Sequence, residues 1–199
     1  MANEKRMAGD YEITAAVSIG YKEVVIGVDE NNTDGQKYMC AYGERNELFE
    51  LFNNVLVSDS YPEIVEIFGK RVTEEAEKVR TEIEGLGIPL AIIRDTDCIP
   101  DNYQNDINGK IIAIDSKILK PEFQRADRQL YLVTGGFGAA ANSRGSAVFC
   151  KNIYDGKTTR YERMDVIGEV KPECLPDWAK AKLREMNEPK KNRNKVRER

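Results

Sequence analysis

The chain has 199 residues, of which 41% are hydrophobic and 32% charged, and this composition indicates a globular protein with a core of one or two domains. Its net charge is −4 at pH 7, and it has no histidine, which excludes Ser-His-Asp, Cys-His and His-Glu-x-x-His catalytic sites. No apolar stretch approaches the ~18 residues that cross a bilayer and no secretion signal is visible, so we expect a cytoplasmic protein with no membrane partner.

Residues 11–42 have the pattern of three β-strands that follow a disordered N-terminus, residues 1–10. Residues 11–19 alternate apolar and polar side chains, and residues 23–29 are rich in β-branched ones. Asn31 to Gly35 form a dense turn signal before a third strand at residues 36–42. The sequence therefore predicts a three-stranded antiparallel meander.

A long amphipathic helix is predicted from about Tyr61 to Glu84. Pro62 suits its first turn, its apolar residues recur at steps of three and four, and Gly85 ends it. Because a three-stranded sheet needs one face covered, we expect this helix to pack on the meander and complete an N-terminal ββα-type domain, residues 11–88. A short helix that seals an edge of that core is expected at Leu48, Phe49, Leu51 and Phe52.

The second half of the chain is predicted to be a separate β-rich domain. Residues 89–108 have the composition of a connection, and residues 109–186 then form a small curled antiparallel sheet or partial barrel with a C-terminal helix. Asp155-Gly156 is the strongest hairpin signal, because a tight type I′ turn needs positive φ at both central positions. The predicted fold class is therefore α+β.

The chain ends in a basic segment, residues 187–199, which we expect to be disordered. Residues 190–199 carry six basic residues and one acidic residue, so the rest of the chain is more acidic than its net charge suggests. Such a segment can attract phosphate backbones, or it can be a solubilising end or a linker.

Four scattered cysteines, none in a Cys-x-x-Cys pair, indicate reduced and mostly buried thiols in a reducing compartment: Cys40, Cys98, Cys150 and Cys174. The sequence also has no Walker motif and no zinc-ligand spacing. We therefore expect no cofactor and no bound metal.

The best candidate site is the glycine cluster Gly135-Gly136-Phe137-Gly138, which continues into Asn142, Ser143 and Arg144 between two apolar runs. Glycines so close together demand an unusual turn or a close approach of a partner to the backbone. The spacing is not that of a phosphate-binding loop, and the next element is another strand rather than a helix, so a wide hairpin loop is one interpretation. A binding loop is the other, in which Phe137 stacks on a base or inserts into a protein partner.

A second candidate surface is the basic hairpin that carries Lys157, Arg160 and Arg163, with Tyr154 and Tyr161 interleaved. These residues could line a nucleic-acid surface. They fit equally well a solvated strand face with cross-strand charge pairs.

A resemblance adds what residue chemistry does not. Residues 125–138, 142–149, 165–168 and 171–180 resemble parts of an uncharacterised domain found in large polyvalent proteins of conjugative transposons and integrative conjugative elements of Gram-positive bacteria. The similarity covers about residues 11 to 185. It implies a role in the transfer of a mobile genetic element or in evading host defence, and it supplies no catalytic motif.

The expected function is that of a mobile-element accessory protein, a non-enzymatic interaction module with an anti-defence role such as anti-CRISPR or antirestriction. Its expected partner is nucleic acid or a host defence nucleoprotein, bound through the Gly135 to Gly145 loop and the basic hairpin. A first alternative is a histidine-free enzyme acting on RNA, DNA or nucleotides, with Arg144, Lys151, Tyr154 or Asp127 in its site. A second alternative is a scaffold of the conjugation machinery that binds transfer proteins.

Overall fold

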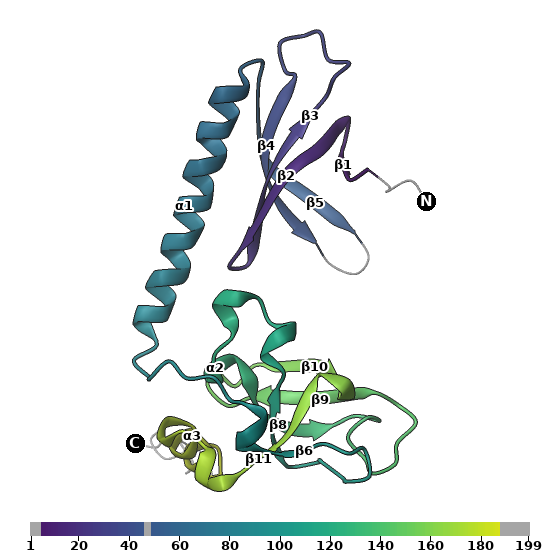
Figure 1. The fold of residues 1–199 in the computed structure, drawn as a ribbon, viewed down its shortest axis with the longest axis vertical. Helices are drawn as coiled ribbons and strands as arrows, with labels where there is room; N and C mark the ends of the chain where they lie inside the picture. Colours follow the sequence, from purple (N-terminus) through teal and green to yellow (C-terminus); the bar gives the residue numbers. More distant parts are fainter. Residues whose placement is uncertain (1–4, 46–48, 188–199) are drawn as a thin grey trace, which may run out of the picture. The chain divides into compact units, whose positions relative to one another are not determined.

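The computed structural model describes residues 5–45 and 49–187 and has an α+β fold (Figure 1). The chain divides into two compact units, Met1–Gly87 and Ile88–Arg199. Residues 188–199 of the basic segment lie outside the described residues, and so does Leu48. None of the helices in the described ranges combines the length and apolar character needed to cross a bilayer.

The first unit is a five-stranded antiparallel meander with one long helix. Its strands are hydrogen-bonded in chain order: β1 (Met7–Ala8), β2 (Tyr11–Ile19), β3 (Lys22–Val28), β4 (Tyr38–Arg45) and β5 (Glu50–Ser58). Helix α1 (Tyr61–Gly85) follows, within one residue of the range that the apolar stripe indicates. Ser60 caps it, since its side chain accepts a hydrogen bond from the Glu63 N–H at 3.4 Å.

Two strands of this unit correct the sequence prediction. β1 lies in the N-terminus predicted to be disordered, and the two-residue turn Gly9-Asp10 joins it to β2, with Gly9 at φ +63°. The strand β5 takes the place of the short helix predicted around Leu51. Two β-branched residues, Val55 and Val57, flank Leu56 in this strand, and β5 pairs with β4. The sheet therefore has five strands instead of three.

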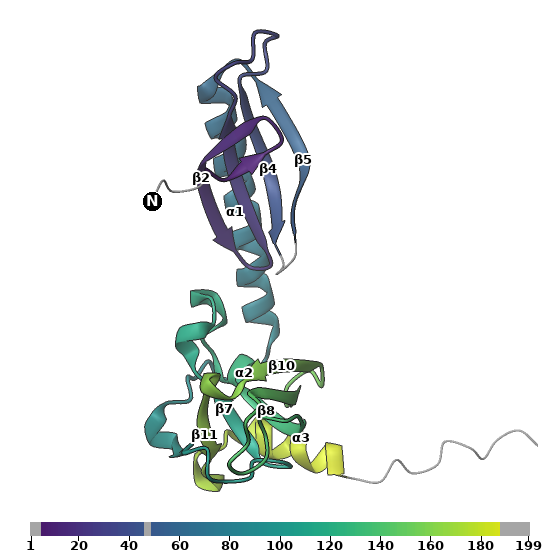
Figure 2. The same cartoon turned by 90° about the vertical axis from the view of Figure 1, so that its right-hand side faces the viewer.

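The core of the first unit fills both faces of the sheet. On the face covered by α1, Ile64 packs with Val24, Ile26, Cys40 and Tyr42. On the other face, β1 and the beginning of β2 bend over the sheet (Figure 2), and their side chains join a second cluster: Ala8, Val25, Met39 and Ala41, with Tyr11, Ile13 and Phe52 partly buried beside it.

The second unit is a six-stranded antiparallel sheet with the strand order β10-β9-β8-β7-β11-β6. Its strands are β6 (Cys98–Pro100), β7 (Ile111–Ile114), β8 (Leu130–Gly135), β9 (Ala147–Asn152), β10 (Thr158–Glu162) and β11 (Val166–Val170). Its helices are α2 (Ala126–Gln129) and α3 (Asp177–Asn187), and its 3-10 turns are η1 (Asp95–Asp97), η2 (Ser116–Ile118), η3 (Pro121–Phe123), η4 (Arg163–Asp165) and η5 (Pro172–Cys174).

Residues 89–108, predicted to be a connection, contribute η1 and the edge strand β6 to this sheet. Within η1 the Asp97 carboxylate accepts the Arg94 N–H at 2.8 Å. The predicted β9–β10 hairpin is present, but its loop spans residues 153–157. The Asn152 side chain widens it by accepting the N–H groups of Tyr154 and Asp155 at 2.8 and 3.0 Å.

The sheet of the second unit packs one core cluster on each of its faces. One cluster contains Ile112, Ile114, Tyr131, Val133 and Val148, and Ala139 from the β8–β9 loop joins it. The other face packs against α2 and α3, and its members are Ile93, Cys98, Ala113, Ala126, Leu130, Ile153, Val170, Leu175 and Ala179. These clusters hold β8 and β9 in place, and the candidate loop connects those two strands.

Candidate binding loop and basic sheet face

The glycines of the β8–β9 loop, residues 136–146, let its two arms pack closely. A Cβ atom on Gly136, which has φ +108°, would lie 2.3 Å from the Ala147 carbonyl oxygen. A Cβ atom on Gly138 would lie equally close to the Ser146 oxygen, and its own N–H donates to Ala147 at 2.8 Å. Larger residues would separate the arms. The wide-hairpin interpretation thus explains why these residues are glycine.

Arg163 braces this loop from inside the unit, and this corrects the expectation that it lies on an exposed hairpin. Its side chain is 1% exposed, and its Nε and Nη2 atoms each donate to the Asp101 carboxylate at 2.6 Å. Its Nη1 atom donates to the Gly138 and Ala139 carbonyls at 2.7 and 3.2 Å. Because β10 ends one residue earlier and the chain turns into η4, Arg163 points inward. It is unavailable to a ligand.

The braced loop presents two side chains to solvent. Phe137 is 85% exposed, and Arg144 is exposed and makes no ion pair or side-chain hydrogen bond within the described part of the chain. Ser143 fixes the backbone between them, because its hydroxyl contacts the Phe137 carbonyl and accepts the Gly145 N–H at 3.0 Å. Asn142, at φ +52°, donates its N–H to the Tyr103 carbonyl at 2.9 Å. The exposed aromatic ring therefore stands on a fixed backbone.

A sheet face with aromatic and basic side chains adjoins β8 on strands β9 and β10. Arg160 lies opposite Phe149 in the register, and Thr158 lies opposite Lys151. Residues directly opposite or two apart in antiparallel strands share a face, so these four lie together, away from the buried side chains of Val148 and Cys150. Phe149 is 49% exposed. Sequence reasoning missed it, although the alternation of β9 could have separated it from its buried neighbours.

The other predicted members of the basic hairpin are placed differently. Lys157 lies in the hairpin loop and pairs with Asp155 at 3.5 Å, while Arg160 pairs with Glu162. Tyr161 faces the core, where its hydroxyl meets that of Tyr131 at 2.9 Å and burial raises its pKa. Tyr161 is therefore a core residue, and the exposed aromatic ring on this sheet face is that of Phe149.

Two of the residues considered for an enzyme, Asp127 and Tyr154, are engaged in structural contacts. Asp127 is buried and accepts the Arg125 guanidinium at 3.1 and 3.2 Å. Tyr154 packs edge to face with Trp178 at a centroid distance of 5.8 Å. No group of three or more Cys, Asp or Glu side chains that could hold a metal ion occurs within residues 5–45 and 49–187.

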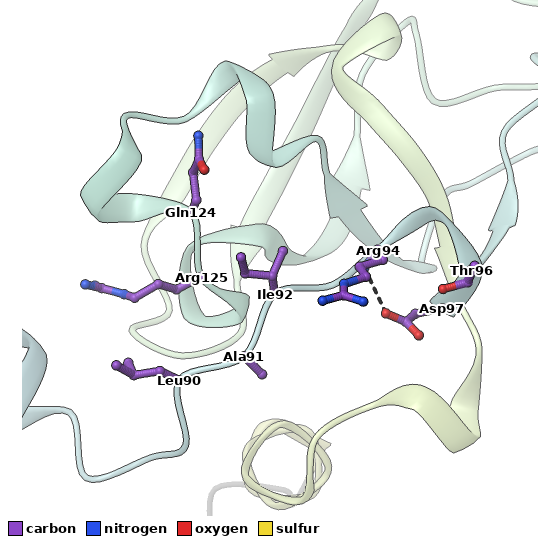
Figure 3. A pocket seen from close by; sticks show the side chains of 8 residues that line it. All are labelled: Leu90, Ala91, Ile92, Arg94, Thr96, Asp97, Gln124 and Arg125. Carbon is purple, nitrogen blue, oxygen red and sulfur yellow. Dashed lines mark hydrogen bonds between the residues drawn. The ribbon is translucent and has the colours of Figure 1, made fainter.

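The second unit also has an open cavity of about 620 Å³ on the segment predicted to be a connection (Figure 3). It is lined by Leu90, Ala91, Ile92, Arg94, Thr96, Asp97, Gln124 and Arg125. Its buried cation, Arg125, is paired with Asp127, and Figure 3 shows the Arg94 side chain between Ile92 and Asp97. The cavity thus offers one exposed cation, Arg94, beside the Asp97 carboxylate.

Comparisons with protein-family models, with curated proteins and with solved structures found no match to this chain. The resemblance to a domain of polyvalent mobile-element proteins therefore depends on the residues quoted for it and stays a prediction. What the structure adds is the geometry of the loop and of the β9–β10 face.

Proposed function

We propose that this protein is a non-enzymatic interaction module whose second unit binds single-stranded nucleic acid, free or within a nucleoprotein. The observation that carries the proposal is Phe137, exposed on a loop whose backbone is fixed by Arg163. An aromatic ring on a rigid support needs no ordering when a base stacks on it, and such stacking is worth about 1–3 kcal/mol per base.

Charge supports nucleic acid over an apolar protein pocket as the partner. Arg144 follows Phe137 on the same loop, and Lys151 shares the β9–β10 face with Phe149, where Arg160 is paired with Glu162. Exposed rings alternating with guanidinium and ammonium groups match the bases and phosphates of a single strand. The number of cations is small, so we expect moderate affinity that falls with salt concentration.

The biological role that we propose comes from the resemblance to mobile-element proteins. Such a module would act in the bacterial cytoplasm, where its four unpaired cysteines, three of them buried, are compatible with a reducing environment. Its target would be the nucleic acid of a host defence complex, consistent with an anti-CRISPR or antirestriction role. A scaffold that joins transfer proteins would instead bind no oligonucleotide.

The test is fluorescence anisotropy of the full chain with labelled single-stranded RNA and DNA of about 20 nucleotides, over a range of salt concentrations. Phe137→Ala is expected to weaken binding about 5-fold or more, and Arg144→Ala to weaken it and reduce the salt slope by about one. Tyr21→Ala, which removes an exposed ring from the first unit, is the matched control. Equal affinity of Phe137→Ala and the wild type would refute the proposal.

A gel of the oligonucleotide after incubation separates binding from catalysis. We expect intact RNA and DNA. Cleavage that disappears in Arg144→Ala would replace the binding module by the histidine-free enzyme considered above.

A further inference from the structure

Tyr103, in the loop between β6 and β7, has a backbone conformation that large residues rarely adopt. Its φ is +59°, and within residues 5–45 and 49–187 the other non-glycine residues with positive φ are two asparagines, Asn54 and Asn142. Asparagine tolerates this region because its short side chain can hydrogen-bond locally, whereas a bulky residue is disfavoured there. A tyrosine at this position therefore needs an explanation beyond the shape of the loop.

The backbone of Tyr103 is attached to the same support as the β8–β9 loop. Its N–H donates to the Asp101 carboxylate at 3.4 Å, and that carboxylate also accepts the Arg163 guanidinium. Its carbonyl accepts the Asn142 N–H at 2.9 Å. Tyr103 and Phe137 are thus held by one network of contacts around Arg163, which also donates to the carbonyl of the residue after Phe137.

Few contacts engage the Tyr103 side chain. The residue is 49% exposed, and its hydroxyl makes no hydrogen bond within the described part of the chain. Its ring centroid lies 5.6 Å from the guanidinium carbon of Arg163, which is a cation–π contact. An aromatic ring that rests on a fixed cation and is half exposed can stack on a further planar group.

We propose that Tyr103 is a second stacking platform, so that the second unit holds two bases of one strand, one on Phe137 and the other on Tyr103. This inference rests on the proposed function, because it assigns a further residue to the same site. Both backbones are already fixed, so the protein need not rearrange to order the two nucleotides.

The side chains beside Tyr103 fit a base rather than a phosphate group. Asn102 and Gln104 are exposed amides, which both donate and accept hydrogen bonds, as base edges do. Asp106, in the same loop, is an exposed carboxylate that would repel a phosphate. We therefore assign the phosphate contact to Arg144 and a base contact to Tyr103. A change at Tyr103 should then leave the salt dependence of binding unaltered.

Tyr103→Leu tests this assignment in the anisotropy assay with single-stranded RNA and DNA of about 20 nucleotides. Leucine keeps an apolar group beside Arg163 but has no flat ring, so we expect the affinity to fall about 5-fold or more with an unchanged salt slope. Tyr103→Phe keeps the ring and should bind like the wild type. Met164→Ala is the matched control, because Met164 is 78% exposed next to Arg163 but has no ring, and its loss should leave the affinity unchanged.

The outcomes distinguish this inference from the proposed function. If Phe137→Ala weakens binding and Tyr103→Leu does not, the inference is overturned and the proposed function stands. If neither substitution weakens binding, both are overturned. A loss in Met164→Ala equal to that in Tyr103→Leu would replace stacking by general apolar contact and overturn the inference alone.

Urea unfolding excludes a merely structural role of the ring. Tyr103→Leu should unfold at the same urea concentration as the wild type. A clear loss of stability that Tyr103→Phe restores would assign the ring to the support of Arg163 and overturn the inference.

The double variant Phe137→Ala with Tyr103→Leu tests whether two bases are held. Because each ring takes a different base, the two losses should multiply to about 25-fold or more. A double variant that binds as well as the weaker of the two single variants would contradict the second base.

Discussion

Replacement of Arg163 by methionine should destabilise the second unit without removing any surface charge. Methionine approximately retains the aliphatic volume of arginine, but it leaves the Asp101 carboxylate, whose side chain is 4% exposed, without its counter-charge. It also removes the donors to Gly138 and Ala139. Breaking a buried ion pair from one side costs about 3–5 kcal/mol, and the lost hydrogen bonds overlap with that figure instead of adding to it. We expect a loss of about 3–5 kcal/mol.

The assay is urea unfolding followed by tryptophan fluorescence. Trp178 is the sole tryptophan and packs in the second unit against Tyr154, so its emission reports that unit. Arg160→Met is the control, because Arg160 forms an exposed pair with Glu162 whose removal should change the unfolding free energy by less than about 0.5 kcal/mol.

A double substitution separates the buried charge from the loss of packing. Arg163→Met combined with Asp101→Leu removes both charges, and it should recover part of the stability lost in the single variant. A loss below about 1 kcal/mol in Arg163→Met would refute the bracing role of this residue. The same result would remove the main support for a rigid binding loop.

Three further variants or measurements test the close packing and burial. Gly138→Ala should lower the unfolding free energy by about 1–3 kcal/mol in the tryptophan-monitored urea assay, because its Cβ would clash with backbone. Gly69→Ala, inside α1 with nothing within 4 Å of the added atom, should instead raise the melting temperature seen by circular dichroism, with a gain of about 0.5–1 kcal/mol. Burial raises the pKa of the Cys98 thiol to about 11 and that of the Cys150 thiol to about 12, so both thiols stay protonated at pH 8. Mass spectrometry after brief alkylation at that pH should therefore find the label on Cys174, which is only partly buried. Fast labelling of Cys150 would contradict its burial.

Local signals predicted the elements that depend on local chemistry. Helix α1 follows from its apolar stripe and from Pro62 in its first turn, and the β9–β10 hairpin follows from Asp155-Gly156. β5 was missed because adjacent apolar residues fit a helix or a strand equally well, and pairing with β4 decides between them. Sequence periodicity does not contain that tertiary contact.

The exposure of the candidate loop follows its sequence pattern, whereas one of its supporting contacts does not. Phe137 and Arg144 are exposed on the β8–β9 loop, and binding by that loop stays a prediction. Arg163 was assigned to the surface because arginine is usually exposed, and its partner Asp101 is 62 residues earlier in the chain. A buried pair of such separation leaves no local pattern.

The bracing of the β8–β9 loop by Arg163 has a consequence for which loop residues can be substituted during evolution. Arg163 holds the loop by donating to backbone carbonyl groups from below the surface, so these contacts do not depend on the side chains of Phe137 and Arg144. Phe137 and Arg144 can therefore be exchanged for other residues while the scaffold that holds them keeps its shape. Under the proposed function, variation at those two positions would change the bound partner and leave the folding of the second unit intact.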